Sequence, residues 1–151
     1  MPGITCLLSN QAGPIAPAAS SHLDSLKATF PHLEIATGNP APNAFVCQAQ
    51  NAGYRVAEGD YRGWRVYHEM QDSPALAEGF CSLLDALAEA PEGESELKSL
   101  WRKHLARYTG SFFLLAIHPE SGRLVFANDA LARLPVYLYR KGGSFALGRE
   151  T

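Results

Sequence analysis

Cysteine carries the most reactive side chain in this sequence, and three cysteines occur, Cys6, Cys47 and Cys81. None of them forms a CxxC or CxxxH pair, and the five histidines include no pair spaced four residues apart on a helix face. This spacing predicts no structural zinc site and no other metal site. Three unpaired cysteines instead indicate reduced, buried thiols in a cytoplasmic protein.

Pro2 offers a different chemistry. Removal of Met1 would leave proline as a secondary amine at the terminus, which tautomerases use as a general base. Such enzymes run from strand to helix to strand directly after the proline. Residues 10–20 of this chain are rich in alanine, proline and glycine, and they predict a loop there instead. An N-terminal-proline tautomerase is therefore kept as an alternative only.

Basic and aromatic side chains are mixed in residues 61–67, as they are on surfaces that stack single-stranded nucleic acid. The whole chain, however, has 13 Lys and Arg against 15 Asp and Glu, which is a formal charge of −2. Proteins that bind nucleic acid usually carry a net positive charge or a basic surface, and this composition does not predict one. We therefore expect no nucleic-acid partner.

The length of 151 residues suits one domain, and residues 1–151 are treated as a single domain. Hydrophobic residues make up 46% and charged residues 19%, which is typical of a globular fold. The apolar runs are shorter than the about 20 residues that cross a bilayer. The early run at residues 4–8 is also far shorter than the core of a secretory signal. These features predict a cytoplasmic protein without a membrane partner.

Hydrophobic periodicity divides the chain into strands and helices. The expected strands lie at residues 4–8, 45–50, 54–58, 64–70, 111–118, 123–128, 136–140 and 145–148. The expected helices begin at Ser21, Ser73 and Ser95, and residues 37–43, with two prolines and a glycine, predict a loop. The last four strands are expected to form one antiparallel meander. Because strands and helices come in separate blocks, the predicted fold class is α+β.

The C-terminal third carries an ordered set of motifs. A helix leads to Gly110-Ser111-Phe112, Asp129 is followed by Pro135-Val136-Tyr137, and a glycine turn precedes a strand near Glu150. The chain also opens with Met1-Pro2-Gly3-Ile4. Over residues 95–150 and the first four residues, the chain resembles the class II glutamine amidotransferase domain of asparagine synthetases and lactam synthetases. The positions that match the family motifs are Gly3, Gly110, Phe112, Asp129, Pro135, Tyr137 and Glu150.

The resemblance implies the fold of the N-terminal-nucleophile hydrolases, an αββα sandwich of two antiparallel sheets with flanking helices. In that family a free N-terminal cysteine is the nucleophile, but Pro2 stands in its place and offers no thiolate. The family's NGEIYN segment, which helps to stabilise the oxyanion, has no counterpart, and neither has the SGGxDS loop of its ATP-using half. We therefore expect no catalytic residue and no cofactor. Cys6 is the alternative nucleophile, although a buried core thiol is the favoured interpretation.

Lactam-forming relatives also lack the cysteine, so the resemblance implies a non-catalytic domain that acts as a scaffold or partner-binding module. Its partner would be an ATP-dependent synthetase domain, in cis or in trans. The family's domain continues for a few strands beyond the position of Thr151, which suggests a truncated domain or a piece completed by a partner. Residues 144–150 are then expected to form an unpaired sheet edge, which either pairs with another chain, as in a homodimer, or is covered by downstream sequence. The alternative is an autonomous small binding protein of unrelated function.

Overall fold

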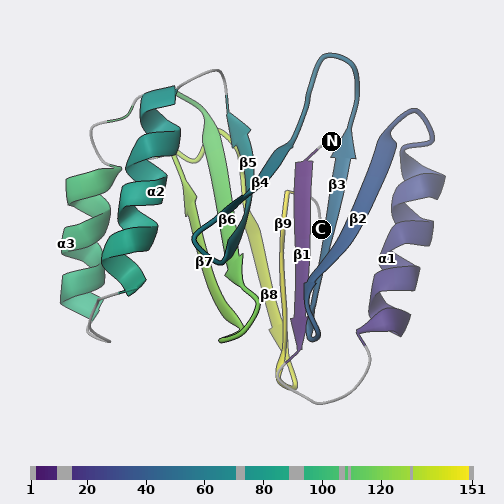
Figure 1. The fold of residues 1–151 in the computed structure, drawn as a ribbon. Coiled ribbons are helices and arrows are strands. Elements are labelled where there is room, and N and C mark those ends of the chain that lie inside the picture. Colours follow the sequence, from purple (N-terminus) through teal and green to yellow (C-terminus); the bar gives the residue numbers. More distant parts are fainter. Residues whose placement is uncertain are drawn as a thin grey trace.

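Two antiparallel sheets lie face to face between helices in the computed structural model of the chain (Figure 1). The structure describes residues 3–9, 15–70, 74–88, 94–105, 108, 110–129 and 131–149. Within these residues there are nine strands and three helices, which confirms the predicted α+β class. One helix covers the outer face of the first sheet, and two helices cover the outer face of the second (Figure 1).

The first sheet has five strands in the order β2-β3-β1-β9-β8. These strands are β1 (Gly3–Ser9), β2 (Glu34–Ala41), β3 (Ala44–Gln50), β8 (Tyr137–Lys141) and β9 (Ser144–Gly148). All neighbours run antiparallel, and the central strand β1 pairs with β3 on one side and with β9 on the other. The first and last described strands are therefore neighbours in the middle of one sheet.

The second sheet has four strands in sequence order. They are β4 (Ala57–Tyr61), β5 (Trp64–Met70), β6 (Phe112–His118) and β7 (Arg123–Asn128). A two-residue turn joins β4 to β5, and its residues Arg62 and Gly63 have φ of 44° and 86°. This is the backbone that a tight hairpin requires. Between β5 and β6 the chain forms the helices α2 (Pro74–Ala88) and α3 (Glu94–His104).

Alternation along the strands produces three apolar cores. One core fills the space between the two sheets and takes side chains from both of them, with Ile4 and Phe113 among its fully buried members. A second core, which includes Phe80, separates the four-stranded sheet from α2 and α3. A smaller core around Phe45 lies under α1 (Ala16–Thr29). The inner strands of both sheets are thus buried on both faces.

The C-terminal strands do not form the single meander that the sequence predicts. β6 and β7 belong to the second sheet, whereas β8 and β9 pair with each other in the first sheet. Residues 144–148 form the inner strand β9, which satisfies its backbone groups against both β1 and β8. The expected unpaired edge at residues 144–150 is therefore wrong for the described residues of that segment. The edge strand on this side is β8.

Residues 37–43, predicted to be a loop, belong mainly to the strand β2 and its connection to β3. Pro40 lies where the register between β2 and β3 shifts, between Gly38 and Ala41. Proline is tolerated in sheets at such irregularities and on edge strands, and β2 is an edge strand. Pairing with β3 thus outweighs the poor strand propensity of this segment.

The helices agree with the sequence predictions except at one start. α2 begins directly after Ser73 and α3 begins one residue before Ser95, as predicted within the usual uncertainty of helix ends. α1 begins at Ala16, five residues before the predicted Ser21. Pro17 lies in its first turn, where a proline is tolerated because an N–H there would have no hydrogen-bond partner within the helix. None of the described helices is long and apolar enough to cross a membrane.

Candidate functional site

The site to which the family resemblance points lies at the start of β1. Pro2 and Glu150 fall outside the described residues, so the site is described from Gly3 onward. Gly3 has a φ of +152°, and a Cβ added to it would lie 2.6 Å from Cγ of Arg149 and 3.0 Å from Oε1 of Glu69. Glycine at this position therefore lets two charged side chains pack directly against the backbone.

Glu69 is the centre of a buried polar cluster beside Gly3. Its side chain extends from β5 and is fully buried, and its Oε1 accepts the N–H of Ile4 at 2.5 Å. Its Oε2 accepts a hydrogen bond from the hydroxyl of Tyr54 and another from Nη1 of Arg149, which is 3.0 Å away. Arg149 follows β9 and is 5% exposed. This Glu69 cluster, made of Glu69, Arg149, Tyr54 and the Ile4 N–H, joins the two sheets.

Burial dominates the electrostatics of the Glu69 cluster. Loss of hydration raises the pKa of Glu69 above its usual value, while the hydrogen bonds from Tyr54 and Ile4 and the charge of Arg149 oppose that shift. Burial also raises the pKa of the Tyr54 hydroxyl, and its hydrogen bond to Glu69 raises it further. Tyr54 therefore remains a donor at neutral pH.

The hydrogen bonds of the Glu69 cluster are used internally. Acyl-transfer enzymes commonly stabilise the oxyanion with backbone N–H groups beside the nucleophile, yet the N–H of Ile4 is donated to Glu69. A negative charge that developed here would also face the Glu69 carboxyl group. Nε of Arg149 is a buried donor that makes no hydrogen bond with the part of the chain that the structure describes. The arrangement is suited to holding the two sheets together and is poorly suited to stabilising an oxyanion.

The cysteines lie in three separate environments. Cys6, the alternative nucleophile, is fully buried between the sheets, and burial raises the pKa of its thiol to about 12. A nucleophilic cysteine must reach the thiolate form, which this environment suppresses. Cys47 lies in the core under α1, where burial raises its thiol pKa to about 11, and Cys81 on α2 is partly exposed. Within the described part of the chain, no cluster of His, Cys, Asp or Glu could hold a metal ion.

Asp129 occupies the turn that follows β7. Asp129 is 4% exposed, and its carboxylate accepts the N–H of Leu131 at 3.1 Å and the N–H of Arg133 at 3.1 and 3.2 Å. These bonds satisfy backbone donors that the turn would otherwise leave without partners. A carboxylate at the junction of a strand and a turn is expected to cap the turn, and Asp129 does so.

The other motif positions are spread over the structure. Gly110 has a φ of +124° just before β6, and Phe112 is buried in the core beneath α2 and α3. Pro135 lies in the connection that leads to β8, and Tyr137 on β8 is 49% exposed. Gly3 contacts the Glu69 cluster, whereas Asp129 follows β7 and Tyr137 lies on the edge strand β8. The motifs therefore do not gather into one catalytic site.

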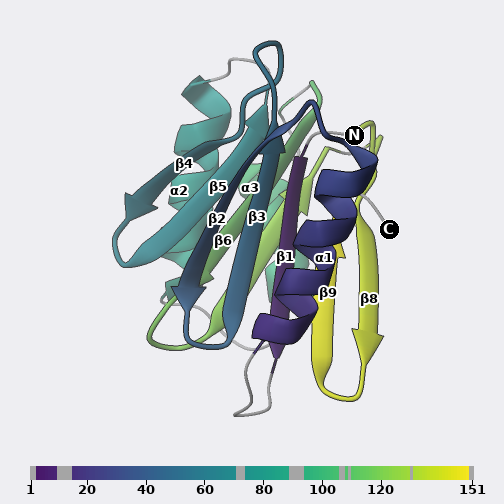
Figure 2. The same cartoon turned by 90° about the vertical axis from the view of Figure 1, so that its right-hand side faces the viewer.

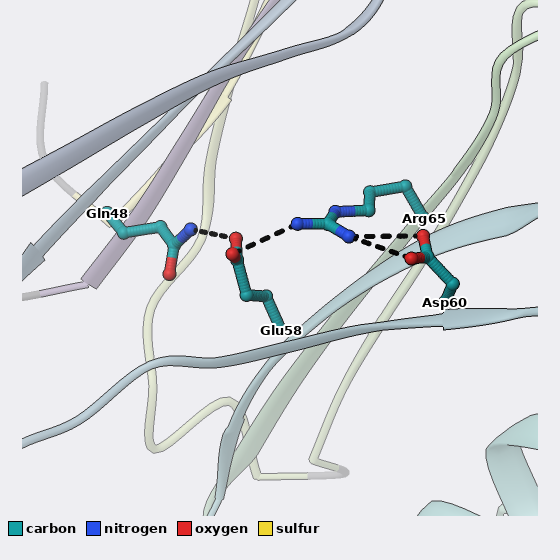
Figure 3. Close-up of polar contacts among 4 residues, drawn as sticks. All are labelled: Gln48, Glu58, Asp60 and Arg65. Carbon is teal, nitrogen blue, oxygen red and sulfur yellow. Dashed lines mark hydrogen bonds and ion pairs between the residues drawn. The ribbon is translucent and has the colours of Figure 1, made fainter.

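A second polar cluster connects the two sheets near the edge strand β4 (Figure 3). The side-chain amide of Gln48, on β3, donates a hydrogen bond to Oε2 of Glu58, on β4, at 2.6 Å. Arg65, on β5, contacts Oε1 of Glu58 at 3.0 Å and both carboxylate oxygens of Asp60 at 3.0 and 3.1 Å. The guanidinium is thus held by two carboxylates of its own chain.

This pairing bears on the mixed aromatic and basic segment at residues 61–67. Trp64 and Tyr67 are 4% and 2% exposed, and each belongs to a core. Because Arg65 is occupied by carboxylates as well, these three side chains do not form an exposed stacking surface.

Sequence reasoning does not single out Glu69 or Arg149, although a signal for both is present. Each follows a core residue by two positions, Tyr67 on β5 and Leu147 on β9, and therefore falls on the core face. A charged residue in core register predicts a buried partner of opposite charge. The identity of the partner is hidden, because the two residues lie 80 positions apart.

Comparison with models of known protein families gives no match for this chain, and a search of curated proteins gives none either.

Proposed function

We propose that this chain is a non-catalytic domain of the glutamine amidotransferase type, which binds a partner in an amide- or lactam-forming synthetase. An ATP-dependent synthetase domain is the partner, in cis or in trans. In this proposal the two sheets and their flanking helices correspond to the αββα sandwich of the N-terminal-nucleophile hydrolases. The central place of β1, directly after residue 2, supports that correspondence.

The observation that carries the proposal is the Glu69 cluster at the start of β1. An N-terminal nucleophile needs a free oxyanion donor close by, and the N–H of Ile4 is engaged by a buried carboxyl group. Arg149 packs against Gly3 so closely that even a methyl group there would clash. The space next to residue 3 is thus filled by a compensated ion pair.

Engagement of the Ile4 N–H by Glu69 implies a large loss of transition-state stabilisation. Loss of one oxyanion donor alone costs about 3–4 kcal/mol of transition-state stabilisation. Pro2 adds the loss of the thiolate, and the buried Cys6 supplies no substitute at neutral pH. The Glu69 cluster at the start of β1 therefore favours a structural or binding role over glutamine hydrolysis.

Ammonia release from glutamine tests the chemical half of the proposal. Neither the unmodified chain nor the Pro2→Cys variant should release ammonia, and neither should be labelled at residue 2 by a diazoketone analogue of glutamine. Activity of the unmodified chain would refute the proposal, and its survival or loss in Cys6→Ser would identify the nucleophile. Activity of Pro2→Cys alone would show that the Glu69 cluster does not block the site.

The partner half is tested through the neighbouring coding sequence. If an ATP-pyrophosphatase domain lies downstream or in the adjacent reading frame, the purified chain should bind it in sedimentation experiments and raise its rate of amide formation. A synthetase that neither binds the chain nor responds to it would favour the autonomous binding protein instead.

A further inference from the structure

The exposed apolar side chains of this protein are concentrated in one short segment. Among the described residues, the large hydrophobic side chains that are exposed are Leu131, Tyr137, Leu138 and Tyr139, with exposed fractions from 49% to 72%. Three of them are consecutive on β8. Scattered exposed apolar residues are ordinary, but here two exposed tyrosines share one face of the same strand, and exposed apolar groups that cluster in this way mark interaction surfaces.

β8 is also the edge strand that is least protected against pairing. It pairs with β9 in regular register over all of its length, and no described strand pairs with its other side, which therefore offers backbone groups for pairing. The edge strand β2 is interrupted by a register shift at Pro40. The edge strand β4 carries Glu58 and Asp60, and the edge strand β7 is tied to α2 by Arg123, which donates to the carbonyl of Leu87 at 2.8 Å.

The outer face of β8 is also not covered by any described helix. Figure 2 shows α1 lying over the middle of the first sheet, with β8 outside its reach at the far edge. Tyr137 and Tyr139 lie opposite Gly148 and Ala146 of β9, which are too small to cover the tyrosine rings. The two rings therefore stand on an open sheet surface next to an open strand edge.

The charged residues of the segment 131–149, which contains β8, are all basic. Residues 131–149 contain no acidic side chain, and their cations are Arg133, Arg140, Lys141 and Arg149. Arg149 is neutralised by Glu69, and Arg133 lies 3.9 Å from Asp129. Arg140 and Lys141 are exposed at the end of β8, and neither makes an ion pair with a described residue.

We propose that β8 binds an extended segment of the partner protein, which adds to the first sheet as a sixth strand and places acidic side chains beside Arg140 and Lys141. Alternate apolar side chains of that segment would cover Tyr137 and Tyr139. Strand addition of this kind takes affinity from backbone hydrogen bonds and specificity from alternate side chains. The proposal rests on the partner-binding function proposed above and assigns its surface.

The charges favour an acidic partner over a second copy of this chain. Pairing of β8 with β8 would bring two copies of Arg140 and Lys141 to one short junction without any carboxylate of that segment. The acidic edge strand β4 is no better suited, because Glu58 and Asp60 are already paired with Arg65.

Peptide binding to the full chain tests the proposal. The probe is a short capped peptide of alternating valine and threonine with two glutamates at one end, prepared with the glutamates at either terminus because a strand can add in either direction. The better of the two should bind about tenfold more tightly than its counterpart with lysines, and less tightly in high salt. Amide exchange at residues 137–141 should slow on binding.

The controls separate strand addition from general attraction. The double variant Arg140→Glu, Lys141→Glu should reverse the preference between the two peptides. The double variant Arg102→Glu, Lys103→Glu on exposed positions of α3 makes the same change in net charge and should leave it intact. A peptide N-methylated on alternate residues should lose binding, since strand pairing needs its N–H groups.

Three results would overturn the proposal: no preference for the acidic peptide, equal binding of the N-methylated peptide, or unchanged preference in the Arg140 and Lys141 variant. Concentration-dependent dimers that protect residues 137–141 would identify a second copy as the occupant and would also overturn it. None of these results bears on whether the chain releases ammonia from glutamine. The ammonia assay therefore tests the chemical half of the proposed function separately.

Discussion

Replacement of Arg149 by methionine should destabilise this protein far more than the loss of any exposed charge. Methionine keeps much of the apolar stem that packs against Gly3 but removes the guanidinium 3.0 Å from Glu69. Glu69 is fully buried and would keep only the hydrogen bonds from Ile4 and Tyr54. Removal of one partner from a buried pair typically costs about 3–5 kcal/mol. For a domain of this size, that corresponds to a decrease in Tm of about 6–20 °C.

The pH dependence of that loss gives a second, independent readout. Burial raises the pKa of Glu69, so the folded state holds this proton to higher pH than the unfolded chain does. The stability that Glu69 contributes is therefore complete below its unfolded pKa and is lost as the pH rises through its folded pKa. Arg149 lowers the folded pKa, so Arg149→Met raises it further. The cost of Arg149→Met should thus be largest at neutral pH and should shrink toward the unfolded pKa.

Urea unfolding followed by circular dichroism measures these differences. The matched control is Arg55→Met, because Arg55 and Glu34 form an ion pair at 2.8 Å with side chains 58% and 67% exposed. Such a surface pair contributes less than about 1 kcal/mol. Glu69→Gln combined with Arg149→Met should cost less than the sum of the two single variants. If Arg149→Met costs no more than Arg55→Met, or if its cost does not change with pH, the account of the Glu69 cluster is wrong.

Three further outcomes follow from packing. Gly3→Ala should lower the free energy of unfolding, measured in urea, by about 1–3 kcal/mol, because its Cβ would lie 2.6 Å from Cγ of the buried Arg149. The control Gly59→Ala should be neutral in the same assay, because the space around Gly59 is open. Phe113→Ala should cost about 3–5 kcal/mol as a fully buried aromatic, and thermal unfolding should show a smaller loss for the partly buried Phe126→Ala. Cys81 should be the first thiol to react with a disulfide reagent in the native protein, which mass spectrometry of the modified peptides measures. Rapid modification of Cys6 or Cys47 would contradict the burial described for them.

Elements with strong periodicity could be predicted from the sequence, because local pattern and tertiary packing agree there. Pro74 after Ser73 sets the start of α2, and the apolar run at residues 112–117 forms the buried part of the strand β6. The pattern of residues 34–41 is weak, so the strand β2 exists only through its pairing with β3. The assignment of strands to sheets could not be predicted, since hairpins β6–β7 and β8–β9 look alike in sequence but pack in different layers.

The candidate site shows the same division. The turn-capping role of Asp129 is local, because its partners lie within four residues, and it could be predicted. The Glu69 cluster depends on contacts between residues separated by 65 and 80 positions, which no periodicity encodes. The single meander predicted for the last four strands would place Phe112, Phe113 and Tyr137 in one core, yet Phe112 faces the helices and Tyr137 faces outward. Neighbouring residues of a strand point to opposite faces, so Phe112 and Phe113 cannot share a core.

The central position of β1 sets an order for folding during synthesis. Thr5 lies opposite Cys47 on one side and Gly148 on the other, so β1 gains its second neighbour only after almost the whole described chain has emerged from the ribosome. The second sheet and its helices, at residues 57–128, need no strand from outside that range and can form first. Pairing between residues so far apart in sequence is slow. Until it occurs, the edge of β1 that later pairs with β9 is unpaired and can aggregate. The growing chain is thus most vulnerable just before its last described strand is made.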